Sequence, residues 1–419
     1  MGCIDQSSME DHAQTAAPYS TGNGAGEKMN VPRVFLKCLT VFLIIGLLTG
    51  CWDRNEMDEL AFVMASGIDL TEDGQVEVTL QIALPTGIPS SLASGGRSVK
   101  PVLVLSAKGK DGIDALGKLQ TQLSRRINLG HRGVLIFGEE YARHGIDQVL
   151  DTLLRSPESR FNSYVVTASG TTAKEILNST YQLESIPALG INNLQSNDFS
   201  FSIKMDKFIE TVSSPELDAV TGAIRIANKK TGSETFMLDK AAVYRENKLV
   251  GFLSGMQLKS FRLAKGHVNG MKLSVDMEPP KERYKGTVAV QILKSTTKIR
   301  TRIRNGMPEI TLSVKATAQI ISNDTTIDFN KAANLQAAEE KFSDELQKSM
   351  TSIVSLSQNK FKADILGVGR ELHIEHPFYW KTAKTAWEEL YPKVPVSLQT
   401  DIQIERIGRM QANPNVQMK

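Results

Sequence analysis

A cysteine at position 51 has the sequence setting of a residue that is chemically modified. It follows an apolar run that ends at Leu48 and the small residues Thr49 and Gly50, which leave room for a signal peptidase. Arg33 and Lys37 provide a positive flank, and the uncharged stretch 38–51 is shorter than the roughly 20 helical residues that span about 30 Å of hydrocarbon. This pattern is typical of a bacterial lipoprotein signal. We therefore predict that cleavage exposes Cys51, whose sulfur carries a diacylglycerol thioether and whose amino group is acylated.

Lipid at Cys51 would hold the mature protein at a membrane without a spanning helix. Two or more acyl chains anchor firmly, because each buried methylene contributes about 0.8 kcal/mol and one chain alone binds only marginally. An uncleaved N-terminal membrane helix that happens to end in cysteine is the alternative. The predicted product is a folded body tethered to the outer face of a cytoplasmic membrane.

Residues 1–28 lie upstream of this signal, although signals of this kind usually begin a few residues before their charges. Met29 occupies that position, so we expect translation to start there, and we assign 1–50 to an N-terminal extension and the signal peptide. Met1-Gly2-Cys3 resembles an acylation signal, but Gln6 stands where a myristoylation motif requires Ser or Thr.

Composition limits the function classes open to the rest of the chain. Its length of 419 residues leaves room for two or three domains after the signal. The 49 basic and 46 acidic residues nearly balance, which argues against a nucleic-acid binder, because that class concentrates positive charge. The cysteines are Cys3, Cys38 and Cys51, so the predicted mature part has no thiol besides the lipidated one. It has no disulfide and no cysteine metal site, and must fold on its hydrophobic cores.

Other residues that could act as catalysts or metal ligands are poorly arranged. His373, Glu375 and His376 do not match the His-Glu-x-x-His spacing of a zinc-protease helix, and on a strand His376 would point away from the other two. His131 lies before an apolar strand, where a structural histidine is favoured over a ligand or base. Adjacent glutamates point apart on a helix, so the following pairs make poor acid–base partners: Glu139-Glu140, Glu339-Glu340 and Glu388-Glu389. We predict no catalytic residue, no cofactor and no metal site.

Strand and helix patterns alternate in the first half of the chain. Segments 60–69 and 76–84 predict a hairpin that turns at Asp73-Gly74. The loop 85–99 is rich in Gly, Ser and Pro and lacks the Gly-Lys-Ser/Thr of a phosphate-binding loop. The polar stretch 181–198 has no clear periodicity and is taken as a boundary. Between them we expect strands at 102–107, 134–137 and 164–168, helices at 113–127 and 146–154, and a capped helix beginning at Thr172-x-x-Glu175.

Antiparallel signals dominate the second half. The expected elements are a hairpin over 241–253, a longer hairpin over 286–304 and 309–321 turning near Asn305-Gly306, a long helix over 335–356, a helical stretch from His376-Pro377 to Leu390, and a last strand over 394–404. The predicted fold class is α+β and multi-domain. A mixed α/β domain covers 51–198, and largely antiparallel sheets with a long helix cover 199–419, with a further division placed near residue 285.

Two surfaces in the second half allow two interpretations each. Five basic residues share one face of the predicted strand 286–304: Lys294, Lys298, Arg300, Arg302 and Arg304. That face is either solvated, which also discourages edge pairing, or attracts anionic headgroups or an acidic partner. Trp380, Trp387 and Tyr379 are expected in the core, with a protein interface as the alternative.

Three sequence blocks carry a resemblance to a known family. They are Cys51–Glu56 with Gly67-Ile68-Asp69, the segment 129–160, and Lys362-Ala363-Asp364-Ile365-Leu366-Gly367-Val368-Gly369 with the tryptophans after it. In this order and spacing they resemble the bacterial spore-germination lipoproteins, the C subunits of germinant receptors (the Ger(x)C family). The likeness runs from about residue 35 to the end.

The resemblance implies a location, partners and a role. The protein is expected on the outer face of the spore inner membrane, together with two polytopic membrane subunits that sense nutrients and open an ion path. The family's C subunit has no established catalysis, and its role looks like receptor assembly, stabilisation or coupling. Its fold is described as three mixed α/β domains. A solute-binding lipoprotein of a transporter, which needs two lobes and a ligand cleft, is the first alternative; a cell-wall hydrolase is the second.

Overall fold

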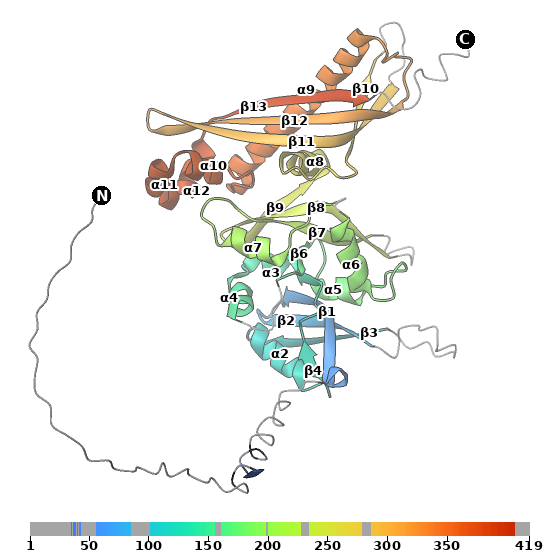
Figure 1. Cartoon of the computed structure of the whole chain (residues 1–419), viewed down its shortest axis with the longest axis vertical. Helices are drawn as coiled ribbons and strands as arrows, with labels where there is room; N and C mark the ends of the chain where they lie inside the picture. Colours follow the sequence, from blue (N-terminus) through green and yellow to red (C-terminus); the bar gives the residue numbers. More distant parts are fainter. Residues whose placement is uncertain are drawn as a thin grey trace, which may run out of the picture. The chain divides into compact units, whose positions relative to one another are not determined.

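The computed structural model describes the chain from Glu56 onward as a compact unit of its own (Figure 1). Met29, Cys51 and the loop 85–99 lie outside the described residues. None of the described helices is long and apolar enough to cross a bilayer. The described residues are 56–84, 101–155, 161–197, 200–227, 234–278 and 286–406, with positions 35, 37, 38, 40 and 42.

Within the described residues, nine strands form one sheet in the first half of this unit. Strand β1 (Leu60–Leu70) pairs antiparallel with β2 (Val76–Ala83), which pairs in turn with β3 (Val102–Gly109). The turn between β1 and β2 places Gly74 at φ +76°, a left-handed conformation that glycine adopts without strain. The hairpin predicted at Asp73-Gly74 is confirmed.

The middle of this sheet is parallel. Strand β1 pairs with β5 (Val134–Phe137), which leads to β6 (Tyr164–Ala168) and β7 (Val220–Ala227). All four residues of β5 are buried, as expected for a parallel strand covered on both faces. The remaining strands are the short β4 (Arg126–Asn128), parallel to β1, and the antiparallel β8 (Thr235–Arg245) and β9 (Lys248–Ser254).

Helices cover both faces of the first sheet. On one face lie α2 (Gly112–Gln120), α3 (Glu139–His144), α4 (Asp147–Arg155) and α7 (Met205–Val212), whose apolar residues share one buried cluster with β1, β2 and β5. On the other face lie α5 (Ala173–Asn178) and α6 (Pro187–Ser196). Thr172 caps α5, because its hydroxyl accepts a hydrogen bond from the Glu175 N–H at 3.0 Å.

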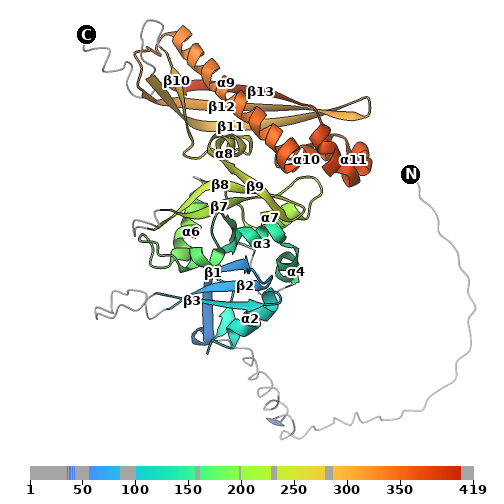
Figure 2. The ribbon, with the colours of Figure 1, turned by 180° about the vertical axis from the view of Figure 1, so that it is seen from behind.

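A second sheet has the order β10-β11-β12-β13. Its centre is the hairpin of β11 (Gly286–Arg304) and β12 (Met307–Asn323), whose turn residues Asn305 and Gly306 both have positive φ, as the sequence predicts. Figure 2 shows α9 (Ala332–Ser355) lying across this sheet. The edge strands are β10 (Lys272–Met277), antiparallel to β11, and β13 (Val396–Arg406), parallel to β12.

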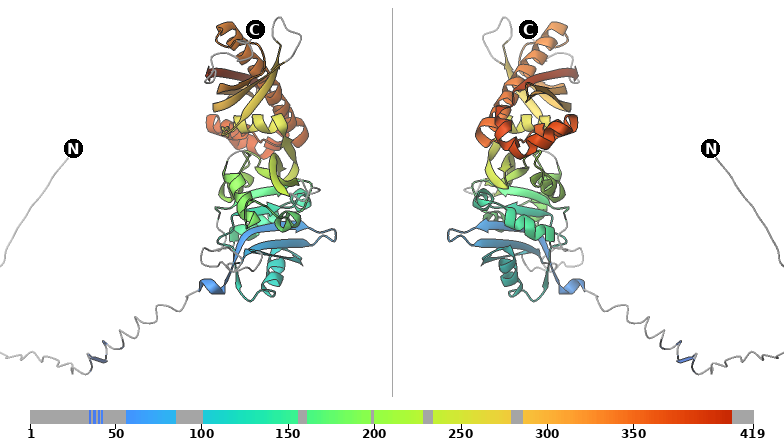
Figure 3. Two further views of the ribbon diagram at one scale, coloured as in Figure 1. Left: turned by 90° about the vertical axis from the view of Figure 1, so that its right-hand side faces the viewer. Right: turned by 90° about the vertical axis from the view of Figure 1, so that its left-hand side faces the viewer.

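Three short helices follow α9 along the chain. They are α10 (Val368–Glu375), α11 (Pro377–Ala383) and α12 (Trp387–Leu390), and they form one group next to the second sheet (Figure 3). Trp380 and Trp387 are buried, with ring centroids 5.4 Å apart, so the expectation that they belong to the core is confirmed. Tyr379 is half-buried, and its hydroxyl donates to the Gly306 carbonyl at 3.0 Å.

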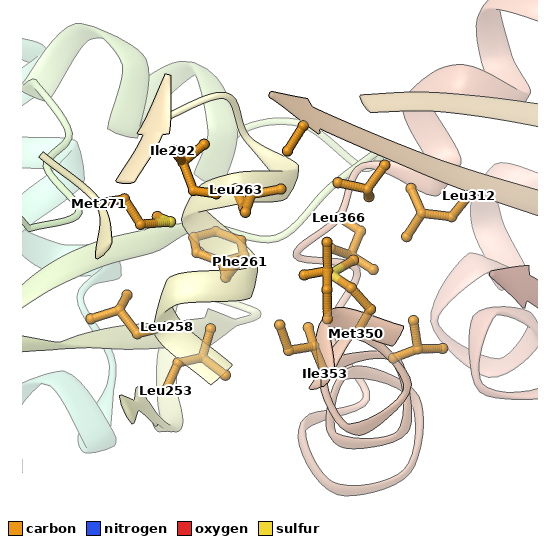
Figure 4. Close-up of a cluster of buried hydrophobic side chains, with 14 of the residues drawn as sticks. Leu253, Leu258, Phe261, Leu263, Met271, Ile292, Leu312, Met350, Ile353 and Leu366 are labelled. Atoms are coloured by element: carbon orange, nitrogen blue, oxygen red, sulfur yellow. The ribbon is translucent and has the colours of Figure 1, made fainter. Parts of the chain in front are cut away.

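Helix α8 (Gly255–Ala264) packs against strands of both sheets. Its Leu258, Phe261 and Leu263 lie in one buried cluster that also holds Leu253 of β9 and Met350 of α9. Figure 4 shows these side chains facing one another, with Ile353 and Leu366 beside them. A single apolar core therefore joins α8, the end of the first sheet and the second sheet.

Two local expectations are corrected by the structure, while the α+β fold class is confirmed. The helix expected over 113–127 ends at Gln120, and Ile127 lies in β4. The stretch 181–198, expected to be irregular, contains helix α6. The first sheet continues past residue 198 through β7–β9, and whether residues 198 and 285 bound independently folding domains stays a prediction.

Candidate functional site

The segment 362–369 forms a tight buried loop, which we call the Asp364 loop. It begins after a π-helical turn, Leu356–Phe361, that ends α9. Lys362 at φ +50° and Gly367 at φ +85° reverse the chain direction at the two sides of the loop. A left-handed lysine is uncommon, because its Cβ crowds the backbone, so surrounding contacts must hold the loop in this shape.

Asp364 organises the inside of this loop and is only 2% exposed. Its Oδ1 accepts hydrogen bonds from the N–H groups of Gly367 at 2.8 Å and Val368 at 3.0 Å, and its Oδ2 accepts from Gly369 at 2.7 Å. These are the first amides of α10, which have no partner within their own helix. Burial raises the pKa of Asp364, while the three N–H donors oppose that rise.

Asp218 clasps the loop from the segment that precedes β7. The Asp364 N–H donates to Asp218 Oδ2 at 2.6 Å, and the Asp218 N–H donates to the Asp364 carbonyl at 3.0 Å. Burial raises the pKa of Asp218 to about 7, with the Asp364 and Glu388 charges adding to the rise. Asp218 borders a cavity of about 110 Å³, which gives its carboxyl a route for proton exchange.

Two further side chains, Lys265 and Ser357, bind carbonyl groups of the loop. Lys265, just after α8, donates from Nζ to the Leu366 carbonyl at 3.1 Å, and desolvation lowers its pKa. The Ser357 hydroxyl donates to the Ala363 carbonyl at 2.5 Å and lies 2.6 Å from the Tyr391 hydroxyl. Because the serine proton is already used, Tyr391 must be the donor in that second contact.

A network of ion pairs on the surface connects α10 to the same segment before β7. Arg370 pairs with Glu210 of α7 at 2.9 Å and approaches Glu216 at 3.8 Å. His373 forms a hydrogen bond with Glu216 through Nδ1, and Lys207 pairs with Glu210 at 2.8 Å. These groups are partly exposed, so each ion pair alone contributes little to stability. Together the ion pairs mainly fix the orientation of α10.

Gly369 allows the closest backbone approach in the site. A Cβ at this position would lie 2.6 Å from the Glu216 carbonyl oxygen and 2.7 Å from Trp387 Nε1. Distances under 3.0 Å exclude a side chain unless the neighbours move. In Gly367-Val368-Gly369, the first glycine therefore adopts the turn conformation and the second permits the close backbone contact.

The assembled site connects distant chain segments and includes Asp218, whose raised pKa places its titration near neutral pH. It links the segment before β7 to α8, α10 and the end of α9 through buried backbone and carboxylate contacts. Within the described residues, no group of His, Cys, Asp and Glu side chains is arranged to hold a metal ion. The chemistry this arrangement supports is reversible protonation of Asp218 near neutral pH.

The residues singled out from the sequence are dispersed. His373 and Glu375 lie on helix α10, not on a strand, and His376 follows it. Glu375 accepts from the Thr301 N–H at 2.6 Å, while His373 contacts Glu216, so these side chains have different partners. His131 is exposed and meets the Phe62 ring edge-on at a centroid distance of 5.0 Å. Cys51 lies outside the described residues.

The paired glutamates and the basic strand face also take separate positions. Glu139 binds Arg143 of its own helix and accepts from the Gly170 N–H at 2.7 Å. Glu339 accepts from the Ile404 N–H at 2.7 Å. Pairing of β11 with β12 is regular from Lys294 to Arg304, so the five basic residues of β11 do share one exposed face.

Sequence reasoning missed the buried charges. Asp218 and Lys265 stand in unremarkable sequence surroundings, so only their partners in space reveal them. Asp364 lies in a block quoted for its resemblance, but its role depends on a loop conformation that periodicity does not show. Arg132 was passed over in favour of its neighbour His131, although an arginine two residues before an apolar run, Val134–Phe137, is itself a signal.

Comparisons with known proteins assign a family to this architecture. The model described as "Spore germination protein N-terminal domain" matches residues 53–226, and the model "Spore germination B3/ GerAC like, C-terminal" matches 239–408. Spore germination protein KC of Bacillus subtilis (strain 168) is 27% identical over 400 residues, covering 90% of this chain and 97% of that protein. Spore germination protein B3 of the same organism is 26% identical over 381 residues, covering 89% and 98%.

A solved structure agrees with this assignment at the level of fold. The crystal structure of the GerBC protein has a TM-score of 0.53 and 22% identity, and the match covers 84% of this chain and 100% of that one. Together the two family models span both sheets and the Asp364 loop. The chain therefore belongs to the spore germination protein family that combines GerAC-type N-terminal and C-terminal domains.

Proposed function

We propose that this protein is a lipid-anchored, non-enzymatic subunit of a spore nutrient-germinant receptor. It would sit on the outer face of the spore inner membrane, held by Cys51, and support the assembly or coupling of two polytopic membrane subunits. The observation that carries the proposal is the match of both spore germination domains across nearly all of the folded unit, which follows directly after the predicted lipoprotein signal.

The position of Cys51 gives the proposal a geometric consequence. Only five positions separate Cys51 from Glu56, where the compact unit begins. Five residues span at most about 18 Å when fully extended. A lipidated Cys51 would therefore keep Glu56, the first residue of the folded unit, within that distance of the headgroups, and would raise the unit's effective concentration against membrane partners.

The buried connection at the Asp364 loop suits a coupling role. A subunit that transmits a change between partners needs surfaces that move together, and the loop joins the segment before β7 to the core of the second sheet. A displacement caused by contacts on one sheet would then be transmitted to the other sheet. The role requires docking and rigidity and no chemical step.

Replacing Cys51 tests the anchor. Cys51→Ala is expected to yield soluble or unprocessed protein, to lose label from an alkyne fatty acid supplied to sporulating cells, and to weaken nutrient germination. Cys38→Ala is the matched control, because Cys38 belongs to the segment that the peptidase would remove. Normal membrane fractionation and full germination of Cys51→Ala would refute the anchor.

Co-purification tests the partners. The tagged native protein, extracted from spore membranes in mild detergent, is expected to bring down two proteins with several spanning segments each. Cys51→Ala should recover them less well, and Cys38→Ala as well as wild type. Recovery of the tagged protein alone from membranes that contain such subunits would contradict the proposal.

A further inference from the structure

Arg132 is a buried cation that has no acidic partner among the described residues. It lies just before β5, and only 8% of the residue is exposed. Its Nη1 donates to the Ser66 hydroxyl at a long 3.4 Å, and its Nε has no hydrogen-bond partner among the described residues. A guanidinium has five N–H donors in a planar fork, and the bond to Ser66 is the one contact recorded for them among the described residues.

Keeping such a group buried is unfavourable unless something pairs with it. Desolvation lowers the pKa of Arg132 to about 10, and no carboxylate in the described part of the chain opposes that change. The guanidinium therefore remains charged at neutral pH. Buried charges in folded proteins are normally paired, because an unpaired buried charge loses its hydration energy and gains no ion pair in exchange. A purely structural arginine in this position would be expected to face an acidic side chain.

Arg132 lines a cavity of about 80 Å³ between the first sheet and helices α2 and α4. Ser66 and Tyr141 are polar neighbours in its wall, and the described residues that line it include no aspartate or glutamate. The mouth is bordered by the exposed Gln148 and the half-buried Thr152. The apolar wall is formed chiefly by Val76, Val78, Leu80, Leu116, Val149 and Leu153.

The cavity combines one positive charge with hydrocarbon walls. Arginine binds carboxylates through two parallel hydrogen bonds, and apolar walls favour a ligand with a hydrocarbon chain. A cavity of about 150 Å³ holds benzene, so about half that volume encloses three or four non-hydrogen atoms, and the remaining one to three atoms of a longer ligand would lie at the mouth beside Gln148 and Thr152. An α-ammonium group would find no carboxylate in this lining, which disfavours amino acids with the same chain.

We propose that the Arg132 cavity binds a short-chain monocarboxylate, whose carboxylate pairs with the guanidinium and whose hydrocarbon chain lies against the β2, α2 and α4 side chains. The ligand class is that of propionate and butyrate. This site does not depend on the lipid anchor or on the receptor partners, so it stands or falls separately from the proposed function.

Calorimetry on the full chain in detergent tests binding. Sodium butyrate, titrated up to about 50 mM because so small a ligand has limited affinity, is expected to give saturable heat and to raise the melting temperature. The probes 1-butanol, which lacks the charge, and α-aminobutyrate, which adds an ammonium group, should bind at least about tenfold more weakly. Equal binding of butanol and butyrate, or no saturable heat with butyrate, would overturn the proposal.

Two variants separate ligand binding from folding. Arg132→Met is expected to weaken butyrate binding about tenfold or more, while its melting temperature without ligand equals or exceeds that of wild type, because an unpaired buried charge is removed. Arg125→Met, an exposed arginine in the preceding loop, is the matched control and should bind butyrate normally. A lower melting temperature for Arg132→Met together with wild-type butyrate binding would show a structural arginine and refute the site.

A second change keeps the proposal testable if Arg132→Met does not fold. Leu116→Trp starts from a half-buried position in the cavity wall and fills the space without removing the charge. It is expected to abolish the butyrate heat and the butyrate-dependent rise in melting temperature. Unchanged butyrate binding by a folded Leu116→Trp variant would place the carboxylate elsewhere and end the proposal.

Discussion

Asp218 and Asp364 bind each other twice, although both are acids. The Asp364 N–H donates to the Asp218 carboxylate at 2.6 Å, and the Asp218 N–H donates to the Asp364 carbonyl at 3.0 Å. This reciprocal pair fixes two chain segments that lie 146 positions apart. Backbone donors make the arrangement possible: three N–H groups face the Asp364 carboxylate and one faces that of Asp218, with smaller contributions from the charges of Lys265 and Arg245.

Removing the Asp364 carboxylate should loosen the Asp364 loop. Asp364→Asn leaves at least one of three amides facing an NH₂ group, and we expect the free energy of unfolding to fall by about 2–4 kcal/mol. Urea unfolding measures the loss, and hydrogen exchange should report faster amides at Gly367–Gly369. Asp401→Asn on β13, a half-buried residue whose nearest cation is 3.9 Å away, should change stability by less than about 0.5 kcal/mol. Equal effects of the two changes would contradict the role given to Asp364.

A methyl group at position 369 should be poorly tolerated. Gly369→Ala places Cβ within 2.7 Å of both the Glu216 carbonyl and Trp387 Nε1, and we expect a loss of about 1–3 kcal/mol. Gly117→Ala is the matched control, since its Cβ would meet nothing within 4 Å on helix α2 and should stabilise by about 0.5–1 kcal/mol. Thermal melts distinguish the two signs, and stabilisation by Gly369→Ala would show that the packing is looser than described.

Stability should decrease as the pH rises from about 4 to about 7. The pKa of Asp218 is raised from 3.8 to about 7, so in this window the native chain holds a proton that the unfolded chain has lost. The stabilisation from this bound proton is fully present below pH 4, decreases toward pH 7 and is absent at higher pH. Its upper limit is about 4 kcal/mol, since each pH unit of pKa difference corresponds to about 1.4 kcal/mol.

Asp218→Asn provides the check on this pH dependence. The amide cannot ionise but can still accept from the Asp364 N–H, so the variant should show a flatter profile of unfolding free energy between pH 4 and 7. Glu405→Gln, on the exposed side of β13, should keep the wild-type slope. A wild-type slope in Asp218→Asn would assign the titration to another group, with Asp364 as the next candidate because burial also raises its pKa.

The basic face of β11 should tolerate charge reversal if it is only solvated. Arg300 and Arg302 are exposed, so we expect Arg300→Glu with Arg302→Glu to change the unfolding free energy by less than about 1 kcal/mol and to leave assembly and germination unchanged. Normal melting together with lost vesicle binding or lost germination would instead identify this face as a contact surface.

Local chemistry made much of the fold predictable. Asn305-Gly306 and Asp73-Gly74 specify tight turns, and the alternating residues around them specify which strand faces are buried. The prediction of one helix over 113–127 was wrong beyond Gln120. Leu123 and Ile127 continue the apolar spacing, but the chain leaves the helix after Gln120 and Ile127 pairs with Ala61 in the sheet.

The sites were harder to predict because their parts come from distant segments. The arrangement around Asp364 requires Asp218 and Lys265, and neither has a local pattern that predicts burial. The Arg132 cavity needs side chains from β2, α2 and α4, although the arginine itself was visible beside its apolar strand. His373 was weighed only for a metal site, and helix α10, on which it lies, was not predicted.

The parallel pairing of β12 with β13 sets an order of assembly. Ile310 aligns with Val396, so the strand that completes the second sheet is made only after the whole intervening chain. Closing so long a loop is slow, and until it closes one edge of β12 has no partner. A chain that ends between residues 323 and 396 would contain β12 without β13 and leave that edge open to pair with another molecule, so termination in this range should produce aggregates and not a shorter working subunit.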